Sequence, residues 1–282
     1  MGLVLLSVIC VAGLSAAIVA VMRWGRLETT PPPLPTTERA LPAAAVLVRY
    51  ARALCVAVVA GGTAGALVGG LGGRLAMRII AATSSDQAQG SITEAEEVVG
   101  KITLEGTLGL VIFVGIAGGA IMAVFYLLVR RWLPGPAWLS GLLFGFLLLA
   151  VFGRIDPVDP NNPDFVLVGP AWLAALVFTV LVPLYGLVLG PMVARLDASY
   201  PVLSGRPKAI AAHAPLLLFV PLGPALVVVA AGAAVAVGMQ RIRPLIRAWR
   251  SAFADSFGRV VLGVTGVVGL AFTGAGLVDI IG

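Results

Sequence analysis

The chain has 282 residues, of which 60% are hydrophobic and only 11% are charged. A soluble globular protein carries about 25% charged residues, so this composition excludes an ordinary soluble domain. The formal net charge is +6, but the basic residues flank apolar segments, which is the orientation signal of membrane proteins. We therefore expect the lipid bilayer as a partner and no nucleic acid.

Apolar stretches of about 18 residues or more predict membrane-spanning helices. The candidates lie at residues 2–22, 53–73, 107–129, 137–152, 168–190, 214–238 and 260–278. They predict an all-α fold, a polytopic transmembrane helix bundle of six to seven helices. The short segment 137–152 is expected to borrow flanking residues. Segment 214–238 contains Pro221-Leu222-Gly223-Pro224, and it either crosses the membrane or folds back as a re-entrant hairpin.

The first apolar segment has no basic residue before it, whereas Arg23 and Arg26 follow it. A cleaved signal peptide carries its positive charge before the apolar stretch, so we predict a retained helix; cleavage near Ala20 is the alternative. Prolines at positions 31, 32, 33 and 35 then predict an extended linker. The predicted divisions are an N-terminal transmembrane helix at 1–22, a Pro-rich cytoplasmic linker at 23–48 and a transmembrane helical bundle at 49–282.

From Arg49 onward the loops alternate in charge. Residues 83–106 and 153–167 are acidic, whereas the connections between the other helices are basic. Because basic loops mark the cytoplasmic side, we predict a multi-pass protein of the plasma membrane whose two acidic loops are extracytoplasmic. The side of residues 239–259 stays open, since it depends on segment 214–238.

Residues 241–259 have a pattern of their own. Apolar side chains such as Ile242, Trp249 and Phe253 recur at helical spacing, while Arg243 and Arg247 fall largely elsewhere. This pattern predicts a basic amphipathic interfacial helix that lies along anionic lipid headgroups. A juxtamembrane connector with ordinary flanking charges is the alternative.

Glycine recurs at every fourth position through one apolar segment, at Gly61, Gly65, Gly69 and Gly73. Helices in lipid gain little from hydrophobic contact with one another, so close backbone approach over small residues is a main source of association. This glycine ladder therefore predicts tight helix packing. Its expected partner is the third helix of the same chain, which carries Gly115 and Gly119. Single glycine pairs at 141/145 and 186/190 are weaker signals of the same kind.

Arg74 and Arg78 follow the ladder, one helical turn apart, near the predicted outer boundary of the membrane. An arginine there is unfavourable unless it snorkels or pairs. We expect both to pair with nearby acids and so to hold the outward loop down as a cap. The acidic candidates are Glu94, Glu96, Glu97 and Glu105. Snorkelling to lipid phosphates and binding of an anionic ligand are the alternatives.

The second acidic loop contains Asp156, Asp159 and Asp164 among prolines and asparagines. So many oxygen-bearing side chains raise a calcium hypothesis, which makes these aspartates a candidate cation loop. The spacing is not that of an EF-hand, and Asp-Pro and Asn-Pro pairs form turns first. A rigid turn is the favoured interpretation, and no cofactor is predicted.

Groups that could carry catalysis are scarce in the sequence. Metalloprotease, nucleophile-elbow and Walker motifs are missing, and the only histidine, His213, has no carboxylate near it. Cys10 and Cys55 lie singly in apolar segments, as small buried hydrophobes do. Mid-membrane ionisable groups, which coupled transporters use, are nearly missing. No catalytic residue is predicted, and the sequence favours a protein that is not an enzyme.

Three stretches carry a resemblance to a known group: Gly69-Gly70-Leu71-Gly72-Gly73-Arg74-Leu75-Ala76-Met77-Arg78, then Ile102-Thr103-Leu104-Glu105-Gly106-Thr107, then Phe152-Gly153-Arg154 with the Asp-Pro-rich loop after it. Over residues 60–195 the chain resembles a group of uncharacterised multi-pass membrane proteins of high-GC actinobacteria. That group has no assigned activity, so the resemblance implies a membrane location only.

Two functions of different kinds remain in view. The glycine ladder and the missing catalytic groups favour a structural or accessory component of the cell envelope, with an unidentified membrane-protein partner. The alternative is a transporter or channel for a small or lipid-like solute. Its motivation is the proline-broken sixth segment, because discontinuous helices often line transporter sites.

Overall fold

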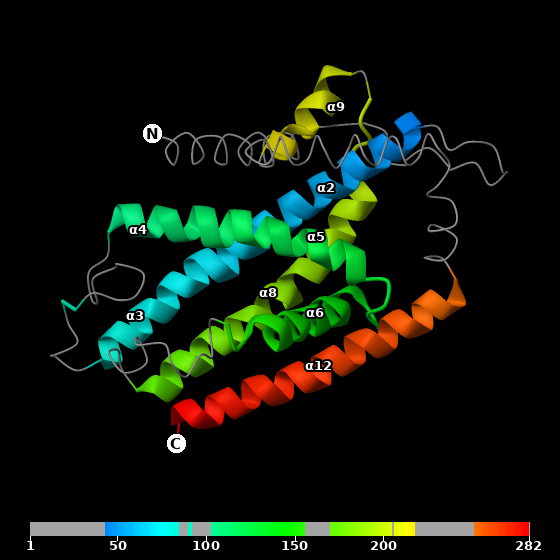
Figure 1. The fold of residues 1–282 in the computed structure, drawn as a ribbon. Helices are drawn as coiled ribbons and strands as arrows, with labels where there is room; N and C mark the ends of the chain where they lie inside the picture. The colour runs from blue at the N-terminus through cyan, green and yellow to red at the C-terminus, as the bar shows by residue number, and fades with distance from the viewer. Residues whose placement is uncertain are drawn as a thin grey trace.

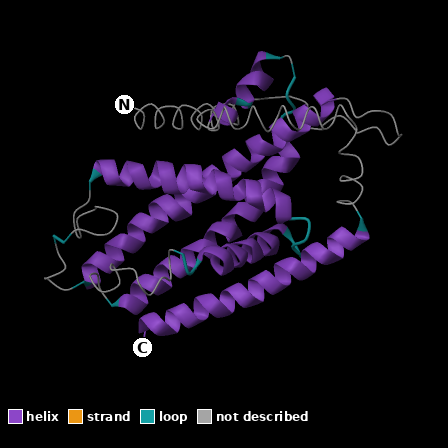
Figure 2. Cartoon of the chain, in the orientation of Figure 1, coloured by secondary structure: helices purple, strands orange, loops and turns teal. Residues whose placement is uncertain are grey.

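The computed structural model describes residues 43–84, 90–91, 103–155, 170–204, 206–217 and 251–281. Within these ranges every regular element is a helix (Figure 2), which confirms the all-α class. The predicted first helix and most of the Pro-rich linker and of segment 214–238 lie outside the described residues. Figure 1 shows the remaining helices as a bundle in which α12 lies along one face.

The first long helix is a continuous rod made of α2 (Ala43–Gly65), η1 (Ala66–Gly72) and α3 (Gly73–Thr83). Its middle part, η1, has π-helical hydrogen bonding, a rare geometry that widens the helix. The rod ends where Ser84 turns extended and its hydroxyl donates to the Ile80 carbonyl at 2.8 Å. It is longer at both ends than the predicted 53–73 segment. It begins earlier, at Ala43, and it continues beyond Gly73 through Arg74 and Arg78.

The second long helix is built in the same way, from α4 (Leu104–Gly109), η2 (Leu110–Gly118) and α5 (Gly119–Val129). Thr103 begins it, because its hydroxyl accepts the Gly106 N–H at 3.1 Å and so caps the first turn. Its π-helical part, η2, packs against η1 of the first helix. The two helices cross at this point (Figure 1).

Two further helices, α6 (Ala137–Phe152) and α8 (Ala171–Ser199), pack extensively against each other. A tight turn with Gly135 at φ +89° leads into α6, which is the left-handed region that suits glycine. The helix keeps to the predicted 137–152, so the expectation that it borrows flanking residues is wrong. Its boundary is set by Pro136, which stands in the extended N-cap conformation.

The described C-terminal region contains the short α9 (Pro207–Ala212) and the long α12 (Ala252–Ile281). The helix α12 packs mainly on α6, and the two run in the same direction, because Asp255 lies near Arg131 and Thr273 near Leu149. The separate interfacial helix predicted at 241–259 is not seen in its described part: residues 252–259 are the first turns of α12. Nothing in the sequence there breaks the helix before the apolar run begins.

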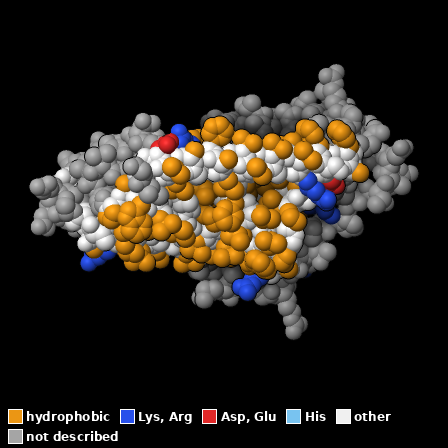
Figure 3. Space-filling model, turned by 90° about the horizontal axis from the view of Figure 1, so that it is seen from below, with side chains coloured by type: hydrophobic (Ala, Val, Ile, Leu, Met, Phe, Trp, Pro, Cys, Tyr) orange, Lys and Arg blue, Asp and Glu red, His pale blue; other side chains and the backbone are white. Residues whose placement is uncertain are grey.

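Four helices are long and apolar enough to cross a membrane, by length and composition. They are Val48–Thr83, Leu104–Val129, Ala171–Ser199 and Ala252–Ile280, and α6 is a shorter apolar helix of the same kind. Their outward surfaces keep large hydrophobic side chains exposed, above all along α12. Figure 3 shows that hydrophobic side chains cover the middle of one face and that the arginines lie towards its margins.

The glycine ladder lies directly against the second long helix. A β-carbon on Gly65 would overlap the Gly115 carbonyl oxygen and stand 3.0 Å from Gly119 Cα. A β-carbon on Gly61 would likewise overlap the carbonyl of Gly119. We call this contact the first glycine seam; it joins the two helices backbone to backbone, as expected for small residues in lipid.

The other two glycines of the ladder are less crowded. A β-carbon on Gly69 would stand 3.7 Å from Gly115 Cα, and one on Gly73 would stand 3.5 Å from Leu110 Cδ2. Both distances are ordinary van der Waals contacts. Among the four ladder glycines the first seam is therefore tightest at Gly61 and Gly65, and the neighbouring Gly70 lies close to Val111.

A second glycine seam joins α6 to α8. Gly141 lies against the backbone of Gly186 and Gly190, and a β-carbon on Gly145 would stand 2.6 Å from Pro183 Cα. The two glycine pairs that were weak signals in the sequence therefore face each other in space. Because glycines face each other at this point, no side chain separates the two helices. Their backbones therefore approach as closely as those of the first seam.

Tyr185 links the two seams. Its ring is buried beside Gly186 on α8, and its hydroxyl donates to the Gly119 carbonyl on the second long helix at 2.6 Å. Gly119 is the first residue after η2. One buried hydrogen bond thus connects α6–α8 with the first pair of long helices.

Prediction for the first seam. Gly65→Ala should lower the thermal midpoint in detergent, because overpacking against a backbone costs about 1–3 kcal/mol. Gly69→Ala is the matched control and should change stability by no more than about 1 kcal/mol, the size of the helix-propensity gain of alanine. Equal effects of the two substitutions would contradict the seam geometry.

Candidate functional site: the charged cluster at the basic end

Basic side chains gather at one end of the bundle, which we call the basic end. It is formed by the start of α2, the end of α5, the start of α6, the end of α8, α9 and the start of α12. The basic residues that the structure describes there are Arg49, Arg52, Arg130, Arg131, Arg195, Arg206, Lys208 and Arg259, while the opposite end has Arg74, Arg78 and Arg154. Only two described acids, Asp197 and Asp255, lie at the basic end.

The centre of the basic end is one carboxylate shared by two arginines. Arg52 Nη1 stands 3.0 Å from Asp197 Oδ1, and Arg130 Nη2 stands 2.8 Å from Asp197 Oδ2. Arg52 is only 6% exposed, whereas Asp197 and Arg130 are part-buried. The cluster therefore holds two positive charges and one negative charge.

Arg52 also completes the C-terminal end of α8. Its Nε donates to the Tyr200 carbonyl at 3.0 Å, and its Nη2 donates to the Asp197 carbonyl. The last carbonyls of a helix have no partner inside that helix, and a cation near them is favourable. A buried arginine on the first helix thus caps a helix that lies 145 residues later in the chain.

The short helix α9 closes over this cluster through Tyr200 and His213. The Tyr200 hydroxyl donates to the Ala212 carbonyl at 2.5 Å, and the His213 ring stands edge-on to the Tyr200 ring. His213 Nδ1 lies 2.8 Å from the Ala209 carbonyl, while Nε2 is buried and has no hydrogen-bond partner in the described part of the chain.

The charge state of His213 follows from these surroundings. Burial lowers the pKa of His213, and the positive charge of Arg52 lowers it further, against the opposing effect of the hydrogen bond to Ala209. The ring is therefore neutral at neutral pH, with the Nδ1 proton donated to Ala209. His213 is a packed side chain in this structure, with no carboxylate beside it among the described residues that would make it a general base.

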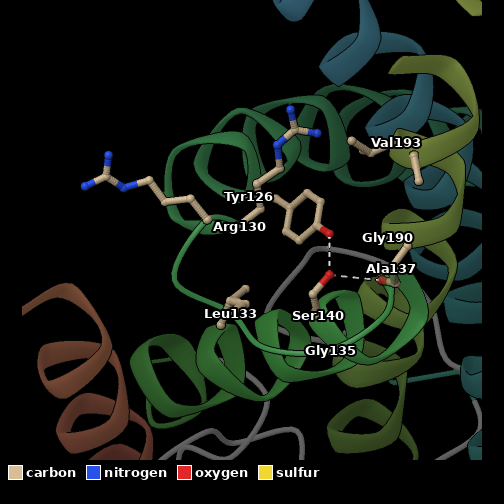
Figure 4. Close-up of a pocket in the computed structure, with 10 residues that line it drawn as sticks. Tyr126, Arg130, Leu133, Gly135, Ala137, Ser140, Gly190 and Val193 are labelled. Carbon is tan, nitrogen blue, oxygen red and sulfur yellow. Dashed lines mark hydrogen bonds between the residues drawn. The ribbon is translucent and has the colours of Figure 1, made fainter. Parts of the chain in front are cut away.

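A cavity of about 330 Å³ opens beside the cluster, between the end of α5, the turn after it, the start of α6 and α8. Its lining includes the two arginines Arg130 and Arg131 and the two hydroxyl-bearing residues Tyr126 and Ser140. The two hydroxyls are 2.8 Å apart, and Ser140 donates on to the Ala137 carbonyl at 3.1 Å (Figure 4). Arg131 also pairs with Asp255 of α12 at 3.3 Å and lies over the Trp132 ring.

At the opposite end Arg74 connects α3 to the start of α4. Its Nε donates to the Thr107 hydroxyl at 3.0 Å and an Nη donates to the Thr103 carbonyl at 3.4 Å. Among the described residues, neither Arg74 nor Arg78 is ion-paired with Glu105, which stands exposed in the first turn of α4. Within the described residues, hydroxyl and carbonyl oxygens of the capping turn are the oxygen acceptors that Arg74 meets, and pairing with the loop glutamates stays a prediction.

The other predicted site residues fall outside the described part of the chain. These are Glu94, Glu96 and Glu97 of the first acidic loop, and Asp156, Asp159 and Asp164 of the candidate cation loop. No group of three potential metal ligands occurs within the described ranges. Cys55 is buried and free, packed among apolar side chains near Tyr200.

Comparison with known proteins supplies no relative: no family model matches the chain, and no similar protein was found among curated proteins or solved structures. The site is therefore interpreted from its own geometry.

Sequence reasoning missed the Arg52–Asp197–Arg130 cluster. Arg52 and Arg130 were treated only as basic loop charges that orient the protein, Asp197 was given no role, and nothing local links positions so far apart. One signal was available, since Asp197 is an isolated acid in a basic stretch at the end of an apolar helix. An acid near a helix C-terminus is unfavourable unless a cation pairs with it.

Prediction for the cluster. Asp197→Asn should destabilise the protein by about 3 kcal/mol, because it leaves the buried Arg52 without its counter-charge. The control is Asp279→Asn, whose pair with Arg154 is exposed on both sides and should be worth less than about 1 kcal/mol. Thermal or denaturant unfolding in one detergent measures both, and similar losses would contradict the central role of Asp197.

Proposed function

We propose that this protein is a multi-pass membrane protein of the cell envelope with a structural or accessory role. The observation that carries the proposal is the pair of glycine seams. A bundle closed by backbone contact and bridged by Tyr185 is suited to holding a fixed shape for a partner. The four long apolar helices and their exposed hydrophobic surfaces support the membrane location.

The same seams argue against the alternative, a transporter or channel for a small or lipid-like solute. Alternating access requires helices to separate or rock around a central site. The helices that meet at the two seams have no side chains between them at the points of closest approach. The cavity described above lies at the basic end of the bundle.

The proposed arrangement places the basic end in the cytoplasm, because basic residues are retained on that side. Segment 218–250 then starts and finishes on one side, since α9 and the start of α12 both lie at the basic end. The acidic loops 83–106 and 153–167 are proposed to be extracytoplasmic. Residues 241–259, including exposed Arg259, are proposed to meet anionic lipid headgroups.

Prediction for the topology. Single cysteines at Ser204 and Ser251, in a chain whose own cysteines are replaced, should react with an impermeant thiol reagent only after the cells are permeabilised. A cysteine at Ser84 should react in intact cells, because Ser84 ends the helix that carries Arg74. Labelling of Ser204 and Ser251 from opposite sides would contradict the arrangement.

Prediction for the function. A disulfide between Gly70→Cys and Val111→Cys should lock the first seam, because a β-carbon on Gly70 stands 3.3 Å from Val111 Cβ, near the range that a disulfide spans. A structural or accessory protein should migrate in native gels of its own membranes as part of a larger assembly, whether the seam is locked or reduced. Each single-cysteine variant is the control.

The contrary result is equally definite. Migration as a lone chain, together with solute flux in proteoliposomes that the disulfide abolishes and reduction restores, would overturn the structural role and establish the transporter.

A further inference from the structure

The charges around the cavity at the basic end do not balance. Arg52 and Arg130 share the single carboxylate of Asp197, and Arg131 is matched by Asp255. Within the described residues, one positive charge of this group therefore has no counter-charge. A part-buried charge of this kind is stabilised when an anion joins the cluster and satisfies the remaining N–H donors.

Arg130 is the side chain best placed to receive that anion. Its Nη2 is held by Asp197 at 2.8 Å, and no other hydrogen bond of its guanidinium is found within the described residues. Arg130 also lines the cavity, and its side chain is 38% exposed, so the N–H groups that do not meet Asp197 remain open to a further acceptor. A guanidinium prefers planar or tetrahedral oxyanions, which it can bind through two N–H groups.

We propose that this cavity binds a phosphate-bearing anion, and that the natural source of the phosphate is the headgroup of an acidic phospholipid. The cavity, at about 330 Å³, is far larger than a single water needs. The anion site itself stands on the arginines and the cavity; only the choice of a lipid as its source rests on the proposed membrane location.

The lining favours a lipid headgroup over a free ion. Beyond the arginines the cavity is walled by Leu133, Val193 and Ala194, and its two hydroxyls are already engaged. Since Ser140 donates to Ala137, Tyr126 donates to Ser140, so neither proton is left for the anion. Arginines together with apolar walls match a phosphate that continues into glycerol and acyl chains.

The position of the cavity along the bundle agrees with this source. Trp138, half exposed, begins α6 beside the cavity, and Trp132 lies in the turn before it. Tryptophans gather at the boundary between hydrocarbon and headgroups. Basic pockets between helix ends on the cytoplasmic side are typical headgroup sites.

The test compares lipid binding by three variants of the full chain. Arg130→Gln removes the guanidinium that is proposed to bind the phosphate. Ala194→Phe fills the cavity from its rim while leaving every charge in place. Arg195→Gln is the matched control, since it removes an exposed charge at the same end that does not line the cavity. The ligand is fluorescent phosphatidylglycerol titrated into protein in neutral detergent, with phosphatidylcholine as the neutral lipid and inorganic phosphate as competitor.

We expect Arg130→Gln and Ala194→Phe each to weaken phosphatidylglycerol binding by about tenfold, the value of one lost charge-assisted contact. Arg195→Gln should change it by less than about twofold, because exposed charges contribute little. Wild-type-like binding by folded Ala194→Phe, or equal losses in Arg130→Gln and Arg195→Gln, would overturn the site and leave only diffuse surface attraction.

The competition arm separates the two sources of phosphate. Weak competition by inorganic phosphate supports the lipid headgroup. The contrary result has two parts: inorganic phosphate alone stabilises the wild-type protein but not Arg130→Gln, and the protein does not prefer phosphatidylglycerol to phosphatidylcholine. That result would keep the anion site and overturn the lipid assignment. These outcomes are independent of the seam-locking experiment, so the site and the structural role can fail separately.

Discussion

Backbone contact across glycine is the constraint on which the rest of this structure depends. In water, two helices associate because their apolar faces leave the solvent, but between lipid-exposed helices that term is nearly absent. What remains is dispersion between closely approaching atoms and hydrogen bonding between helices. Gly61 and Gly65 bring the first two long helices together in this way, and Gly141 and Gly186 do the same for α6 and α8. A side chain at any of these positions would overlap the facing backbone, so the two helices would have to move apart and lose this close contact.

The two seams position the helix pairs, and through them the Arg52–Asp197–Arg130 cluster. Tyr185 holds the two seams in a fixed relation, because it lies beside Gly186 in one seam and donates a hydrogen bond to Gly119 in the other. With the helix pairs fixed, Arg52 meets the end of α8 and Arg130 meets the same carboxylate from the other side. The helix α12 is held differently, chiefly through Thr273 and close contact at Gly269, and most of its surface stays uncovered. It is a peripheral helix of the described bundle.

The sequence predicts the helical class and the tight segment well, because both depend on local periodicity. Glycine at every fourth residue can be recognised without any knowledge of the partner, and Gly115 and Gly119 stood out as the corresponding small residues. The ends of the first helix could not be predicted in this way. The predicted segment ended at Gly73, but the helix continues for another ten residues to Thr83, and Arg74 lies opposite oxygen acceptors at the capping turn of α4.

The Arg52–Asp197–Arg130 cluster also could not be predicted from patterns among neighbouring residues. Opposite charges nearby in sequence suggested that Arg74 and Arg78 would pair with the acids of the first outward loop or with Glu105. Within the described residues, which do not include those loop acids, Arg74 bonds to Thr103 and Thr107. Conversely, Arg52 and Asp197 are distant in sequence and adjacent in space, and only the crossing of two helices brings them together. Pairing between distant charges depends on the fold as a whole, whereas periodicity and capping depend on a few neighbouring residues.

The shortness of α6 has a consequence for the membrane around it. Sixteen residues rise about 24 Å, less than the hydrocarbon thickness of about 30 Å in a typical bilayer. A bilayer that meets this helix must thin locally or let headgroups sink towards it. The thinning would fall beside the turn that carries Arg130, where sunken headgroups are brought level with the charged cavity. The protein would then sort towards thinner patches of membrane, and bilayer thickness would act as a selector of where it resides.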